Sequence, residues 1–272
     1  MKRINLILVL SILFAFTACK NDTKKDENID EAEQTDSLLQ EEVKEEKIVL
    51  TKLSGSPAYA EASLAMNMPK DKVKAGEVDF DFAVNNYELG AQTQPKSPNG
   101  LAASDKGQHI HLIIDNEPYS AHYDPKFKKE MSEGDHVVLA FLSRSYHEAV
   151  KNANSYVVKK ISVGNVTDAN KMDFDPKGEH LFYSRPKGSY KGKDTEKVLL
   201  DFFLVNSNLA VDGNKVRAHI NGQEFILDSW EPYVMENLPM GENTVRLELL
   251  DKDGNLVKGP FNAVTRTFML EE

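Results

Sequence analysis

The feature that most constrains the fold is an internal repeat, in which the second half of the chain resembles the first at a separation of about 107 residues. Tyr123-Asp124-Pro125 in the first half matches Trp230-Glu231-Pro232 in the second. A Gly-acid pair and a set of alternate apolar residues follow in both halves at the same spacing. These further matches are Met131 with Leu238, Gly134-Asp135 with Gly241-Glu242, and Val138, Ala140 and Leu142 with Val245, Leu247 and Leu249. Two copies indicate a duplicated domain, because a solenoid needs at least three.

The residues within each copy have the pattern of β-strands. Short runs show alternating or continuous apolar character, and these runs are residues 78–84, 109–114, 136–142, 198–205, 215–220 and 244–250. Asn221-Gly222 and Asp253-Gly254 are typical of two-residue hairpin turns. The sequence therefore predicts an all-β protein with two tandem antiparallel β-sandwiches of immunoglobulin-like type. We place the first sandwich at residues 51–165 and the second at residues 170–272.

The chain begins with the pattern of an export signal. Lys2 and Arg3 precede an apolar stretch that is shorter than a typical membrane-spanning helix, and Cys19 follows it. The segment Phe16-Thr17-Ala18-Cys19 resembles the lipobox of bacterial lipoproteins, although Phe16 stands where that motif usually has Leu. The resemblance implies that residues 1–18 are a lipoprotein signal peptide and that Cys19 carries a lipid. It implies a location in the cell envelope, anchored to a membrane.

The segment after Cys19 is strongly acidic. Residues 20–47 contain 11 acidic residues, 5 lysines and no aromatic residue, so they cannot bury enough apolar surface to offset the entropy of ordering. We therefore predict a disordered tether over residues 19–50. In enterobacterial lipoproteins, Asp directly after the lipidated cysteine marks retention at the inner membrane. By resemblance, Lys20 at this position implies the outer membrane. The acidic run also partly resembles the surface-export signals of lipoproteins from Bacteroidota. A plain solvated spacer is the alternative.

Charge and cysteine content narrow the possible partners and chemistry. Removal of residues 1–18 takes away two positive charges and changes the net charge from −10 to −12, which argues against a nucleic-acid partner. Cys19 is the single cysteine, so the mature protein has no internal disulfide and no cysteine nucleophile. Sequence motifs of hydrolases and nucleotide-binding proteins are missing, and His147-Glu148 lacks the second His of a zinc-protease motif. We expect a protein that is not an enzyme and has no required cofactor.

The repeat allows matched strands to be compared, and the first difference between the halves is a pair of histidines. In the second half the outward positions of residues 215–220 carry a lysine, an arginine and a histidine. The matching positions of the first half are His109, His111 and Ile113. Residues two apart on a strand face the same side, and His is a common ligand of zinc and copper. Two interpretations therefore stay open: an ordinary polar surface, and a copper or zinc site with ligands His109, His111, His136 and His147.

A second difference concerns the strand over residues 136–142. Its outward positions carry Val137, Leu139 and Phe141, where the second half has Thr244, Arg246 and Glu248. Either the segment over residues 59–68 or the second domain covers this apolar face, or Leu139 and Phe141 form the surface that binds a partner.

Two basic loops could bind an anion. Arg144 lies in Ser143-Arg144-Ser145-Tyr146-His147, and Arg185 lies in a loop over residues 184–191 that also contains serine, lysine and tyrosine. Arginine beside hydroxyl groups suits phosphate or carboxylate, although solvated loops of this composition are common. Trp230 could stack on a sugar ring, but its match to Tyr123 is more typical of a shared core aromatic.

Several segments resemble a family of uncharacterised lipoproteins from Bacteroidota. The resemblance lies in residues 107–115, 134–141, 143–148 and 181–188. It implies an envelope location and the two-domain architecture. Some of these relatives carry a phosphopeptide-binding label, which implies roles for Arg144 and Arg185. We therefore expect a lipid-anchored recognition or scaffold module whose partner is an envelope protein or a peptide, with metal binding and anion binding as alternatives.

Overall fold

The computed structural model describes residues 47–94 and 100–272. The regular secondary structure of these residues consists of β-strands, apart from one short helix. The predicted signal peptide, Cys19 and most of the predicted tether lie outside the described residues. A short 3-10 helix, η2 (Gly192–Thr195), follows β11. Within the described part of the chain, no helix has the length and apolar character needed to cross a bilayer.

The first sandwich consists of a smaller sheet with the order β2-β4-β7 and a larger sheet with the order β3-β9-β8-β5-β6. Its strands are β2 (Ser63–Met68), β3 (Lys72–Val73), β4 (Gly76–Asn85), β5 (His109–Ile114), β6 (Ser120–His122), β7 (Lys126–Met131), β8 (Gly134–Ser143) and β9 (Tyr156–Val163). Neighbouring strands are antiparallel except that β3 runs parallel to β9. The chain passes from the smaller to the larger sheet between β2 and β3, where Met68-Pro69 is a cis peptide.

The second sandwich repeats this arrangement. One sheet has the order β1-β15-β12-β10, and the other has the order β11-β17-β16-β13-β14 with β11 parallel to β17. Its strands are β1 (Val49–Lys52), β10 (His180–Arg185), β11 (Ser189–Lys191), β12 (Val198–Val205), β13 (Lys215–Ile220), β14 (Gln223–Leu227), β15 (Tyr233–Glu236), β16 (Gly241–Leu250) and β17 (Ala263–Glu271). Arg185-Pro186, between β10 and β11, is again a cis peptide.

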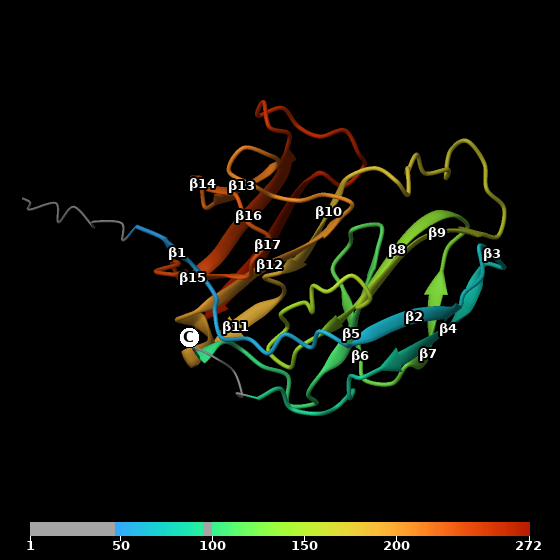
Figure 1. Cartoon of the computed structure of the whole chain (residues 1–272), viewed down its shortest axis with the longest axis horizontal. Helices are drawn as coiled ribbons and strands as arrows, with labels where there is room; N and C mark the ends of the chain where they lie inside the picture. Colours follow the sequence, from blue (N-terminus) through green and yellow to red (C-terminus); the bar gives the residue numbers. More distant parts are fainter. Residues whose placement is uncertain (1–46, 95–99) are drawn as a thin grey trace, which may run out of the picture. The chain divides into compact units, whose positions relative to one another are not determined.

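The two halves therefore have the same strand order once β1 is set aside. β2-β4-β7 corresponds to β10-β12-β15, and β3-β9-β8-β5-β6 corresponds to β11-β17-β16-β13-β14. The predicted all-β fold with two tandem sandwiches is confirmed. The added strand β1 precedes the first sandwich in the chain but pairs with β15 of the second (Figure 1).

Four apolar clusters stabilise the described body. Two of them each fill one sandwich, and the other two, a larger one between the sandwiches and a smaller one, contain residues of both halves. Because β8 alternates, Val138 and Leu142 face the core of the first sandwich while Leu139 and Phe141 face the other way. The cluster between the sandwiches joins Ile113, Val137, Leu139 and Phe141 to Phe174, Phe182, Phe203, Val205 and Phe261.

Candidate functional site

Three histidines of the first half converge at one end of β5. His109 and His111 are fully buried on β5, and His147 follows β8 and is partly buried. His109 Nε2 lies 2.8 Å from His111 Nε2 and 3.2 Å from His147 Nδ1. One ligand atom from each of the three residues lies within 4.8 Å of the others. The structure thus brings together three of the four predicted metal ligands.

Local backbone structure positions His109. The Nδ1–H of His109 donates to the carbonyl of Gly107 at 2.8 Å, which leaves the lone pair on Nε2, the atom that faces the other two histidines. Gly107 has a φ of 83°, and a Cβ there would overlap the carbonyl oxygens of Gly90 and Ala91. Glycine is therefore needed at the position that orients the first imidazole. A hydrogen bond from the remote ring N–H to a backbone carbonyl is typical of metal-binding histidines.

A tight turn positions His147. The backbone N–H of His147 donates to Arg144 O, and that of Arg144 donates to Glu148 O, both at 2.9 Å. Within this turn His147 has a φ of 70°, which lies in the left-handed region that residues other than glycine seldom adopt. Strained backbone of this kind is concentrated at functional sites.

Burial keeps the three imidazoles neutral. It lowers the pKa of His109 to about 4, mainly through loss of solvation. Burial also lowers the pKa of His111 and of His147 well below the ordinary value, and nearby positive charge, including that of Arg185, adds to the effect. At neutral pH the three rings therefore carry lone pairs available to a metal.

Residues of the loop between β5 and β6 and of the second sandwich surround the histidine cluster. The ring of Tyr119 stacks on His111 with 3.6 Å between centroids, and its hydroxyl lies 3.4 Å from His147 Nδ1. Ser184 Oγ lies 3.4 Å from His111 Nδ1. Sequence reasoning missed Tyr119, since no local motif marks it and only the fold brings it to the histidines.

The fourth predicted ligand, His136, is not part of the cluster, and that prediction is corrected. His136 lies near the start of β8, whereas His109 pairs with Ser143 at its end. Its Nδ1 lies 2.6 Å from Asp115 Oδ2, and its Nε2 lies 3.1 Å from Ser132 O. The length of β8 separates it from the other three.

The predicted partner surface at Leu139 and Phe141 is also corrected. Both side chains have no exposed surface. They pack in the cluster between the sandwiches, where the ring of Phe141 stacks on Phe203 at 4.8 Å. The sequence left two segments that could cover this apolar face, residues 59–68 and the second domain. In the structure, residues of the second half of the chain pack against it.

The two arginines predicted to bind an anion lie in different surroundings. Arg144 is buried and already occupied, because its guanidinium lies 3.0 Å from Glu148 and donates to the carbonyls of Ala149 and Pro57. Arg185 is buried beside tyrosines: it donates to Tyr190 Oη at 3.0 Å and lies 5.4 Å from the ring centre of Tyr119. Its Nε is buried and has no hydrogen-bond partner among the described residues. Anion binding by Arg185 stays a prediction.

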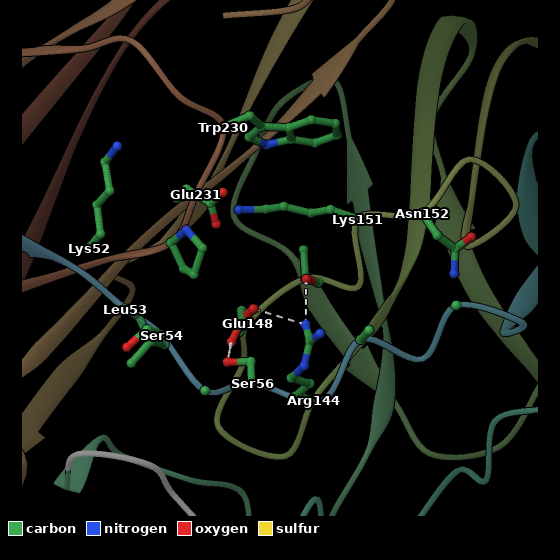
Figure 2. Close-up of a pocket in the computed structure, with 15 residues that line it drawn as sticks. Lys52, Leu53, Ser54, Ser56, Arg144, Glu148, Lys151, Asn152, Trp230 and Glu231 are labelled. Carbon is green, nitrogen blue, oxygen red and sulfur yellow. Dashed lines mark hydrogen bonds and ion pairs between the residues drawn. The ribbon is translucent and has the colours of Figure 1, made fainter.

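Arg144 also lines a pocket of about 720 Å³, shown in Figure 2. Three segments form its walls: residues 52–60, which begin at the last residue of β1, residues 144–152 after β8, and residues 230–232 before β15. Trp230 lies on one side, and the side chain of Lys151 extends beside it in the view. The pocket was not predicted, because its walls come from distant parts of the sequence.

Fold and site together define a tandem β-sandwich protein with a buried histidine cluster. No protein-family model and no curated protein matches the sequence. Among solved structures, the fibronectin(III)-like modules of Clostridium thermocellum CbhA match with 10% identity, 76% of this chain, 94% of that chain and a TM-score of 0.27. The two tandem V-type regions of VCBP3, a v-region-containing chitin binding protein, match with 7% identity, 77% of this chain, 100% of that chain and a TM-score of 0.22.

A third match is SGBP-B of the Bacteroides ovatus mixed-linkage glucan utilization locus. It has 12% identity to this chain and a TM-score of 0.22, and the match covers 76% of this chain but 47% of SGBP-B. This chain thus spans about half the length of that protein. Similarity at these levels concerns the β-sandwich fold and carries no information about a ligand.

Proposed function

We propose that this chain is a metal-binding protein that holds one zinc or copper ion with His109, His111 and His147. The observation that carries the proposal is the convergence of three neutral imidazole nitrogens, with neighbouring separations of 2.8 and 3.2 Å. Ligand atoms around a tetrahedral ion at about 2.0–2.1 Å lie about 3.3 Å apart. Two of the three separations are close to this value, and the third, which is within 4.8 Å, must shorten by up to about 1.5 Å on coordination. Three nitrogen ligands leave a fourth position for water or another ligand.

A core of mutually hydrogen-bonded histidines without metal is the competing explanation. Two features favour the metal. The Nδ1–H bond from His109 to Gly107 leaves one lone pair on Nε2, which accepts from one neighbour, whereas both His111 Nε2 and His147 Nδ1 lie within 3.2 Å of it. His147 also holds a left-handed backbone conformation that costs on the order of 1–3 kcal/mol, and strain of this size is concentrated at functional sites.

Metal content of single variants tests the proposal. Purified protein is incubated with zinc or copper, desalted and submitted to elemental analysis, together with His147→Asn and His136→Asn. Asparagine is the replacement for His147 because it tolerates the left-handed region better than most residues. We expect about one equivalent of metal in the wild type and in His136→Asn, and loss of most of it in His147→Asn.

Two outcomes would overturn the metal proposal. One is a wild-type protein that retains no metal after desalting. The other is equal metal content in wild type and His147→Asn. A circular dichroism spectrum of His147→Asn that matches the wild type shows that loss of metal does not reflect loss of the fold.

We further propose that the protein acts in the cell envelope, anchored by a lipid on Cys19, as a recognition or scaffold module without catalytic activity. The lipobox-like segment before Cys19 and the acidic residues after it support this location. Two sandwiches joined by a shared apolar cluster provide the folded body of such a module.

A further inference from the structure

The pocket that Arg144 lines is separate from the histidine cluster in its lining residues and has the size of a small-molecule site. Its volume of about 720 Å³ lies within the usual range for such sites. None of the three clustered histidines is among its lining residues. Its floor contains Glu148, which accepts a hydrogen bond from Ser56 and faces Arg144 (Figure 2).

Trp230 gives the pocket one rigid aromatic wall. Its Nε1–H donates to Phe202 O at 2.9 Å, and its ring meets Phe203 edge-to-face at 5.0 Å. The ammonium of Lys151 lies 5.7 Å from the ring centre. The indole is thus held in place by contacts on several sides, and it is the aromatic residue that lines the pocket.

Polar groups with unused hydrogen-bonding capacity lie around this wall. Ser54 and Glu231 are exposed at the pocket. Lys151 Nζ is not one of these groups, because it is buried and lies 2.7 Å from the buried carboxylate of Asp201. The pocket therefore presents both donors and acceptors beside an aromatic face.

The charges of the pocket are balanced. Arg144 is paired with Glu148 at 3.0 Å, Lys151 with Asp201 at 2.7 Å, and Lys52 lies 3.9 Å from Asp228. Glu231 adds a negative charge at the rim. Among the described residues that line the pocket, every cation thus has an acidic partner, so the pocket has no excess of positive charge to favour a phosphate.

We propose that this pocket binds a neutral oligosaccharide, with a sugar ring against Trp230 and hydroxyl groups on Glu231 and Ser54. Each sugar hydroxyl both donates and accepts, as the mixed lining requires, and the C–H face of a sugar ring fits an indole. A charged phosphate ligand lacks a counter-ion here, and an apolar lipid chain leaves these polar groups unpaired.

Tryptophan fluorescence tests the proposal directly, because Trp230 is the single tryptophan of the chain. The purified protein, treated with a chelator so that metal plays no part, is titrated with cellohexaose, xylohexaose, mannohexaose, maltohexaose and chitohexaose. Each is added to about 10 mM, above the weak-binding range. We expect a saturable change with at least one of them. No change with any of the five overturns the proposal, as does a response to inorganic phosphate alone.

Two exposed glutamates provide the matched variants. Glu231→Ala removes an acceptor at the pocket rim, and Glu196→Ala removes an exposed glutamate that does not line the pocket. We expect about 10-fold weaker binding in Glu231→Ala, from loss of a charge-assisted hydrogen bond, and unchanged binding in Glu196→Ala. Equal affinities of Glu231→Ala and wild type contradict the assignment. Trp230 itself packs partly against two cores, so its loss is a less specific test.

Discussion

Truncation of Phe141 tests whether the two sandwiches share a core. The side chain has no exposed surface, stacks on Phe203 at 4.8 Å and meets the ring of His111 edge-to-face at 5.1 Å. Removal of a buried phenylalanine costs about 3–5 kcal/mol through lost transfer energy and the cavity that remains. The lost aromatic pair is part of this cost, at about 0.5–1.5 kcal/mol. We expect Phe141→Ala to lower the free energy of unfolding by about 4 kcal/mol.

Urea unfolding followed by the fluorescence of Trp230 measures this loss. Trp230 contacts Phe203, so the signal reports the second half of the chain although the substitution lies in the first. With a slope of about 3 kcal/mol per M, a loss of 4 kcal/mol lowers the midpoint by more than about 1 M. Val211→Ala is the matched control, since Val211 is 78% exposed and its truncation should cost less than about 0.5 kcal/mol. A cost for Phe141→Ala below about 1 kcal/mol would refute a shared core.

Two further predictions concern acid stability and lipidation. Because burial lowers the folded pKa of His109 to about 4, the unfolded chain binds more protons below pH 6.5. The resulting stability is complete above pH 6.5 and falls by about 3 kcal/mol as the pH decreases toward 4. Urea unfolding between pH 7 and pH 5 should therefore depend less on pH in His109→Gln than in the wild type, and equal dependence would contradict the assignment. Labelling of cells with an alkyne fatty acid should mark the wild type and not Cys19→Ser; an equal signal would exclude Cys19 as the lipid site.

Part of the candidate metal site was predictable from the sequence. Alternation along a strand places His109 and His111 on the same side, and both lie on β5 with their ring nitrogens in contact. His147 and His136 have equal standing as sequence candidates. Only the path of β8 decides between them, because His109 pairs with Ser143 at one end of that strand and His136 lies near the other.

The sequence by itself determined the duplicated all-β architecture, because alternation and turn residues act locally and the same pattern occurs twice. Only the tertiary structure decided what covers the outward face of β8, since alternation marks Leu139 and Phe141 as apolar but does not say what packs on them. The second half provides that cover with Phe203 and its neighbours. The pocket beside Trp230 likewise depends on three segments far apart in the chain. Contacts between distant segments depend on how the two sandwiches pack together, and local sequence patterns do not determine that packing.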